Sequence, residues 1–128
     1  MPLRPGMRVL EVGCGPGVAA RAVATRVGPD GFVLATDRSA TAVAQCEAGS
    51  AQELAAGLMA VRLVAAEDLA LRDGEAPYDL AFAVRVGALD GRHPDAGRRA
   101  RARLAEVLVP GGVLYVDGGD PLRAVPLP

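Results

Sequence analysis

The chain has 128 residues and a mass of 13.1 kDa, which is the size of a single domain. Hydrophobic residues make up 51% and charged residues 23%, a composition that excludes a disordered chain. No apolar run is long enough to span a membrane. The net charge of −1 and the aromatic content of 3% disfavour a nucleic-acid partner and an anionic membrane surface.

The N-terminal residues lack the uninterrupted apolar core of a signal peptide, so we expect a cytoplasmic protein. Two cysteines, Cys14 and Cys46, are too few for a disulfide framework or a metal quartet. All 14 basic residues are arginine and alanine is abundant, a bias typical of a GC-rich bacterial genome. Without lysine the chain has no Schiff-base residue and no lysine general base.

Short β-rich runs alternate with alanine-rich stretches along the chain. The pattern predicts strands, buried on both faces, at 8–12, 31–36, 59–64, 78–84 and 113–117. It predicts helices at 18–27, from Ser39 or Thr41 to Ala56 with a weak point at Gly49-Ser50, and from Pro94 or Asp95 to Leu108. The link at 67–77 has room for one helical turn at most.

This order of elements predicts an α/β fold with one domain. We expect a Rossmann-like, doubly wound parallel sheet of about five strands in the order 3-2-1-4-5, with helices on both faces. Ligands bind beyond the carboxyl ends of the strands in such sheets. Functional residues are therefore expected at 11–17, 37–38, 65–68, 84–90 and 117–120.

A glycine-rich turn joins the first strand to the first helix, with the sequence Glu11-Val12-Gly13-Cys14-Gly15-Pro16-Gly17. Glycine lets the backbone approach a ligand closely, and the following helix N-terminus offers unpaired N–H groups. A dinucleotide-binding loop would need its third glycine at position 18, which is Val18. The spacing therefore disfavours a dinucleotide-binding domain.

The turn resembles motif I of the class I S-adenosylmethionine-dependent methyltransferases. Asp37 ends the second strand, where the resemblance implies a carboxylate that accepts from both ribose hydroxyls of the cofactor. The runs at 64–69, 78–83 and 108–114 are similar to the family's adenine segment, fourth strand and entry to the fifth strand. The resemblance covers roughly residues 5–118 and implies S-adenosyl-L-methionine as the cofactor.

The resemblance also implies a cofactor site, in which Glu11 steers the ammonium group of the cofactor. The implied site residues are Glu11, Gly13, Cys14, Gly15, Gly17, Asp37, Arg38, Ala66, Glu67, Asp68 and Arg85. Ala65 stands where the family has an aspartate, so Glu67 or Asp68 would replace that adenine contact. No metal is expected. We expect His93 to be solvated rather than to act as a general base. Asp117 and Asp120 come at and after the end of the predicted fifth strand, so we expect them at the same carboxyl edge of the sheet.

The sequence departs from the family at both ends. We expect no counterpart in this sequence to the family's N-terminal helical lid or to its last two strands. The proline-rich tail at 121–128 is expected to form no hairpin, which would leave residues 113–116 as an unprotected sheet edge. We therefore expect a homodimer that closes this edge and the open cleft.

Two functions remain open. The first is methyl transfer to an unknown acceptor, for which alignment of the reactants and exclusion of water suffice. The second is a cofactor-binding module without turnover of its own that acts with a partner, because the substrate half of the family's fold is nearly absent.

Overall fold

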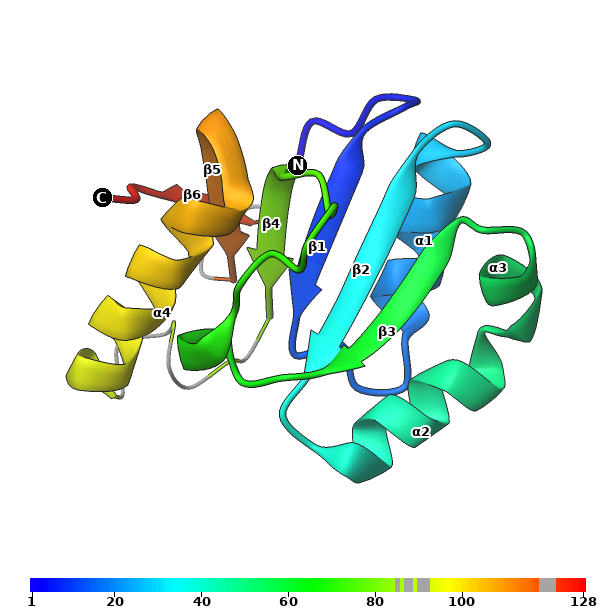
Figure 1. The fold of residues 1–128 in the computed structure, drawn as a ribbon, viewed down its shortest axis with the longest axis horizontal. Coiled ribbons are helices and arrows are strands. Elements are labelled where there is room, and N and C mark those ends of the chain that lie inside the picture. Colours follow the sequence, from blue (N-terminus) through cyan, green and yellow to red (C-terminus); the bar gives the residue numbers. More distant parts are fainter. Residues whose placement is uncertain (85, 87–88, 90–92, 118–121) are drawn as a thin grey trace.

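The fold is that of a computed structural model of the chain, which describes residues 1–84, 86, 89, 93–117 and 122–128. A six-stranded sheet forms its centre, in the order β3-β2-β1-β4-β5-β6 (Figure 1). The first five strands are parallel, and the last is antiparallel to its neighbour. Their bounds are β1 (Arg8–Val12), β2 (Phe32–Asp37), β3 (Met59–Leu63), β4 (Tyr78–Ala83), β5 (Leu108–Val116) and β6 (Arg123–Val125). The predicted class and the order of the first five strands are confirmed.

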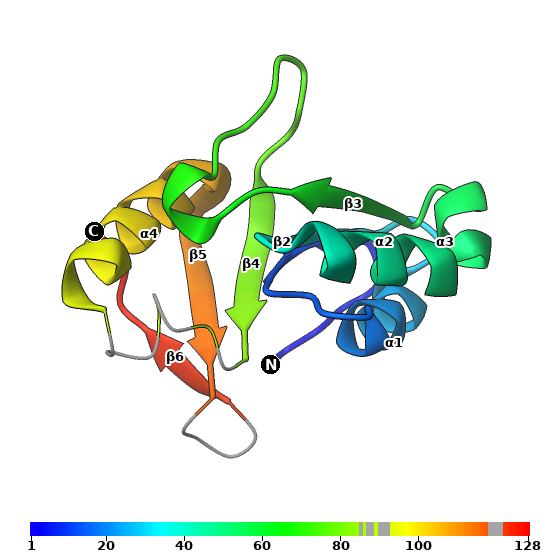
Figure 2. The same cartoon turned by 90° about the horizontal axis from the view of Figure 1, so that it is seen from below.

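Helices cover both faces of the sheet and enclose two hydrophobic cores (Figures 1 and 2). The helices are α1 (Val18–Val27), α2 (Ala40–Gly49), α3 (Ala51–Ala55) and α4 (Pro94–Val107). α1 packs one core against β1 and β2, whereas α4 packs the other against β4 and β5. The predicted weak point at Gly49-Ser50 is confirmed, because α2 and α3 are separate helices. None of the helices described is long and apolar enough to cross a bilayer.

The connection from β3 to β4 holds only one short helical turn, η1 (Ala66–Asp68), as predicted. Parallel strands are usually joined by a longer helix that covers the sheet between them. Here the face of β1, β2 and β3 that is turned toward the viewer in Figure 1 carries no helix. Side chains of the strands and of the connecting loop cover that face instead.

Two expectations for the end of the chain are wrong: the tail does pair with the fifth strand as an antiparallel neighbour, and residues 113–116 do not form a sheet edge. Arg123, Ala124 and Val125 form β6 and pair with Val116, Tyr115 and Leu114 of β5. The prolines at 121 and 126 flank this strand and so remove no N–H group from within it. Val125 also packs against the α4-side core, which holds the tail in place. Residues 114–116 are already paired with β6 and offer no free strand edge to a second copy, so the dimer stays a prediction without this interface.

The entry into β5 also differs from the prediction. The strand starts at Leu108, directly after α4, and its register shifts so that Tyr78 faces Leu108 but Leu80 faces Val113. Residues 109–112 therefore loop out within the strand. A Cβ on Gly112 would lie 2.8 Å from the Leu108 Cβ, so only glycine fits this close approach.

We predict that Val125→Asp detaches the tail and uncovers β5. Val125 is partly buried, and a carboxylate against the α4-side core costs about 1–3 kcal/mol, so Tm should fall by roughly 5–15 °C. Ala124→Asp is the matched control, because Ala124 is exposed on the same strand. Differential scanning calorimetry and light scattering check this prediction. Of the two variants, only Val125→Asp should have a lower Tm, and only Val125→Asp should associate through the uncovered strand and show a larger molar mass in solution. Equal Tm and equal molar mass of the two variants would contradict the packing of β6 against the α4-side core.

Candidate functional site

The glycine-rich turn lies at the carboxyl edge of the sheet, between β1 and α1. Gly13, Gly15 and Gly17 all have positive φ angles, of 79°, 52° and 92°, so glycine is needed at each. The Gly13 and Cys14 N–H groups both donate to the Thr36 carbonyl at 2.8 Å, which ties the turn to β2. A Cβ on Gly15 would meet no atom within 4 Å, so open space lies above this residue.

The Asp37 carboxylate joins the turn to the end of β2. Its Oδ2 accepts the Gly15 N–H at 3.0 Å, and its Oδ1 accepts the Ser39 N–H at 2.9 Å. The Asp37 carbonyl accepts the Val64 N–H at 3.0 Å, which adds the segment after β3. Each carboxylate oxygen keeps a further lone pair, so Asp37 can accept two more hydrogen bonds from a ligand.

Glu11 is buried directly below the turn. It is 4% exposed, and its neighbours across the sheet are Ala35 on β2 and Phe82 on β4. Its Oε1 atom is buried and has no hydrogen-bond partner. Burial, and then the charge of Asp37, raise the pKa of Glu11 to about 8, so the carboxyl is mostly protonated at neutral pH. A buried oxygen without a partner is costly and marks a place where a ligand can donate.

Arg21 on α1 fixes the far side of the turn. Its guanidinium donates to the Pro16 carbonyl at 2.8 Å and to the buried Ser50 hydroxyl at 3.1 Å. A Cβ on Gly17 or on Gly49 would lie 2.9 Å from the Arg21 Nη1, so both glycines make room for it. Sequence reasoning missed this contact, because nothing local links Gly49 to the turn.

The two cysteines lie beside this contact. Both are buried and free, as the sequence predicts for small apolar residues. Burial, and then the neighbouring Cys46, raise the pKa of Cys14, so its thiol stays protonated and is a poor nucleophile. A Cβ on Gly17 would lie 2.6 Å from the Cys46 Sγ, so Cys46 packs under the turn.

The remaining predicted residues fall into two groups. Ala66, Glu67 and Asp68 form η1, which follows Val64 and packs against α4. Arg38 is exposed directly after Asp37. The structure therefore brings the turn, Asp37 and the 65–68 segment together. Arg85 and Asp120 lie outside the described residues.

Two further rim residues lie at the ends of other elements. His93 is exposed at the start of α4, where its side chain makes no capping bond, and Asp117 follows β5. Among the residues that the structure describes, no group of three or more His, Cys, Asp or Glu side chains could hold a metal ion.

Three exposed apolar side chains lie at the same edge of the sheet as the glycine-rich turn. The large hydrophobic residues that are exposed in the described part of the chain are Val18, Leu63 and Val84, at 67%, 55% and 39%. Val18 starts α1, Leu63 ends β3 and Val84 follows β4, so all three lie at the carboxyl edge. An apolar rim around a few polar groups is typical of a ligand site.

Comparisons with known proteins agree with this geometry. A family model described as a methyltransferase domain matches residues 9–112. The chain is 36% identical over 118 residues to a nocamycin O-methyltransferase from Saccharothrix syringae, covering 92% of this chain and 40% of the relative. It is 39% identical over 110 residues to a protein-L-isoaspartate O-methyltransferase from Methylorubrum populi, covering 86% of this chain and 47% of the relative.

A solved structure also aligns well. The [4+2]-cyclase SpnF superimposes with a TM-score of 0.72 and 28% identity, over 89% of this chain and 39% of SpnF. This chain thus spans less than half the length of these proteins. The family match covers most of the chain, and the first five strands have the order 3-2-1-4-5 of the expected Rossmann-like sheet. The chain therefore belongs to the class I S-adenosylmethionine-dependent methyltransferases.

Proposed function

We propose that the chain binds S-adenosyl-L-methionine at the carboxyl edge of its sheet and transfers the methyl group to an acceptor. The observation that carries the proposal is the buried, unpartnered Glu11 carboxyl below a turn that Asp37 holds in place. The family supplies the class of cofactor, and the arrangement of these residues suits it. The acceptor is unassigned, because the relatives act on different compounds and this chain spans only part of each.

The polar residues suit the three parts of the cofactor. The α-ammonium group would donate to Glu11, which would then ionise beside the new positive charge. The ribose diol offers two donors, and Asp37 keeps an acceptor site on each oxygen. The adenine would lie by the 65–68 segment, where the Ala66 N–H and the carboxylates of Glu67 and Asp68 are candidate contacts.

When bound, the cofactor supplies a methyl group already activated by a sulfonium. The residues of this chain then have to bind, orient and exclude water rather than form a covalent intermediate. Val18 and Val84 give the rim an apolar surface from which water is readily displaced. A general base is required only if the acceptor must lose a proton, so no catalytic base is assigned.

A cofactor-binding module without turnover is the second candidate. Exposed apolar residues at the carboxyl edge, such as Val18 and Val84, favour this candidate. A structural neighbour is also named a [4+2]-cyclase, so not every protein of this fold is named for methyl transfer. Incubation with methyl-labelled cofactor and a cell lysate separates the two. Label in an acceptor supports the transferase, whereas cofactor binding without label supports the module.

Location and assembly follow from other features. We propose a bacterial cytoplasmic protein, because all 14 basic residues are arginine, a bias typical of a GC-rich bacterial genome, and because Cys14 and Cys46 are both free thiols. We also propose a homodimer, now through the apolar rim at Val18 and Val84 rather than through β5. Light scattering of the wild-type chain tests the dimer, and a mass of about 13 kDa at all concentrations would reject it.

We predict that Asp37→Ala weakens binding of S-adenosylhomocysteine by roughly tenfold or more. Charge-assisted hydrogen bonds contribute about 1.5–3 kcal/mol, and the variant loses those to the ribose. Asp37→Asn keeps the shape and one acceptor oxygen, so it should bind with intermediate affinity. Asp30→Ala, in an exposed turn, is the control. Isothermal calorimetry measures all four proteins; equal affinity of wild type and Asp37→Ala would remove Asp37 from the site.

Arg21 should act as a positioning residue. We predict that Arg21→Ala raises the Kd for S-adenosylhomocysteine roughly fivefold, because it frees the Pro16 carbonyl, and that Arg21→Lys restores part of the loss. Val23→Ala removes buried volume from the same helix and should lower Tm without changing the Kd. If Arg21→Ala and Val23→Ala lower Tm alike and bind alike, Arg21 has a structural role only.

A further inference from the structure

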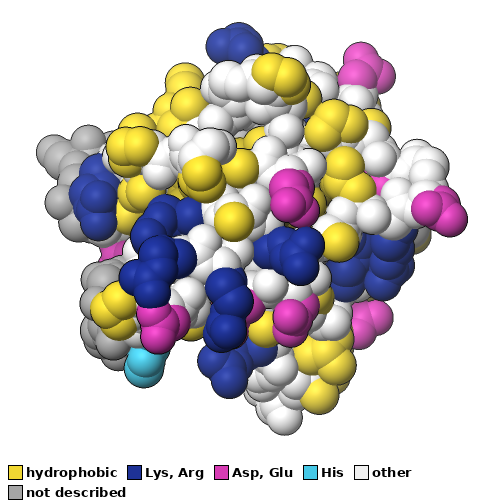
Figure 3. Space-filling view, turned by 60° about the vertical axis from the view of Figure 1, so that its left-hand side comes forward, with side chains coloured by type: hydrophobic (Ala, Val, Ile, Leu, Met, Phe, Trp, Pro, Cys, Tyr) yellow, Lys and Arg dark blue, Asp and Glu magenta, His cyan; other side chains and the backbone are white. Residues whose placement is uncertain are grey.

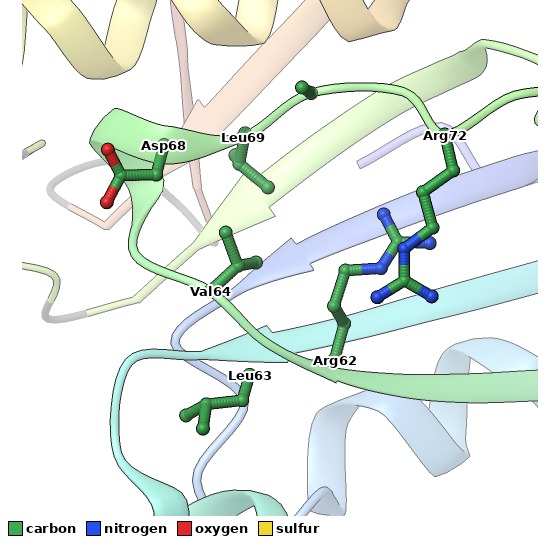
Figure 4. A pocket seen from close by; sticks show the side chains of 7 residues that line it. Arg62, Leu63, Val64, Asp68, Leu69 and Arg72 are labelled. Atoms are coloured by element: carbon green, nitrogen blue, oxygen red, sulfur yellow. The ribbon is translucent and has the colours of Figure 1, made fainter.

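The helix-free face of the sheet carries two hollows. The larger has a volume of about 330 Å³ and the smaller about 200 Å³, and both are lined by Arg62 and Arg72. Figure 4 shows the smaller one, into which the Arg62 side chain rises from β3 and the Arg72 side chain extends from the loop. The wall of the larger hollow is apolar where Phe32, Leu34 and Ala60 form it.

The Glu75 carboxylate accepts four hydrogen bonds beside these hollows. Glu75 accepts a bidentate pair from Arg62 at 3.2 and 3.0 Å, the Arg72 backbone N–H at 2.8 Å and the Tyr78 hydroxyl at 2.5 Å. Burial alone would raise the pKa of Glu75, but these hydrogen bonds outweigh it and lower the pKa to about 2. A carboxylate has about four lone-pair sites, so Glu75 has no capacity for another donor.

Several N–H donors of Arg62 and Arg72 have no hydrogen-bond acceptor among the described residues. The Arg62 Nε atom is buried without a partner, and the Arg72 guanidinium makes no hydrogen bond within the described part of the chain. Arg8, by contrast, is occupied: it donates to the Ala76 and Pro77 carbonyls and lies over the Phe32 and Tyr78 rings.

The charges that line the larger hollow favour an anion. Three arginines face two acids, Glu75 and the exposed Asp73. Figure 3 shows a different arrangement on the side of the molecule where α4 and β6 lie, with arginines mixed among acidic side chains. There Arg98 pairs with Asp95 and Arg103 with Glu106, whereas Arg72 has no acidic partner among the residues that the structure describes.

We propose that the larger hollow is a second ligand site, which binds a small aromatic carboxylate. The planar guanidinium of Arg72 would donate to the carboxylate, whose geometry matches such a donor, and the Arg62 guanidinium in the same lining would add positive charge. The aromatic ring would lie on the apolar wall at Phe32, Leu34 and Ala60. A volume of about 330 Å³ suits a ligand of this size.

The larger hollow lies away from the glycine-rich turn, and Asp68 lines only the smaller hollow. Arg8, Phe32 and Tyr78 are the first residues of β1, β2 and β4, so the larger hollow lies at the amino ends of these strands. The glycine-rich turn lies at the opposite, carboxyl ends. The proposal therefore does not depend on cofactor binding or on methyl transfer.

Nuclear magnetic resonance with benzoate as the probe tests the proposal. We expect saturable shifts of the Arg62 Nε–H signal, and at least tenfold weaker binding by Arg72→Ala. Asp73→Asn removes a competing negative charge and should bind benzoate more tightly. Arg26→Ala, an exposed arginine at the end of α1, is the matched control and should bind as the wild type does.

Two further measurements sharpen the test. Acetate, which lacks the ring, should bind more weakly than benzoate if the apolar wall contributes. Asp73→Asn, at a residue that lines the larger hollow and not the smaller one, should bind S-adenosylhomocysteine as the wild type does. Shifts that never saturate, or equal benzoate affinity of wild type and Arg72→Ala, would overturn the proposal.

Discussion

The hydrogen bonds of Asp37 join the segments that follow β1, β2 and β3 at the carboxyl edge of the sheet. Its side chain accepts from Gly15 in the turn and from Ser39 before α2, and its carbonyl accepts from Val64 after β3. Three segments far apart in the sequence therefore meet at one residue. The positive φ angles of the turn direct its Gly15 N–H group to this carboxylate, so backbone conformation and side-chain position depend on each other.

Glu11 is buried at the same edge, and folding raises the pKa of its carboxyl. Its buried oxygen has no partner, and its carboxyl stays protonated at neutral pH. The unfolded chain would lose this proton near its ordinary value of 4.5, whereas the folded chain holds it up to about pH 8. The free energy of unfolding therefore falls as the pH rises between these values. A bound ammonium group would reverse the cost, because it stabilises the ionised form.

The sequence predicted most of what local patterns determine. The strands and helices follow from apolar periodicity and glycine or proline stops, and Gly15 and Asp37 were found through a motif with a physical basis. Arg123, Ala124 and Val125 were missed, because a strand of three residues between prolines has no local signal and forms only against β5. Arg21 and the Arg62–Glu75 pair were missed for the same reason: their partners are 29 and 13 residues away.

The measurement that tests the account most directly is the number of protons released when S-adenosylhomocysteine binds at pH 7. Calorimetric titration in two buffers of different ionisation enthalpy gives this number. We expect the wild type to release most of one proton on binding, because Glu11 ionises beside the ammonium group of the ligand. We expect Glu11→Gln to release none. Glu47→Gln, exposed on α2, should behave as the wild type does. Binding without proton release by the wild type, or equal release by Glu11→Gln, would contradict the account.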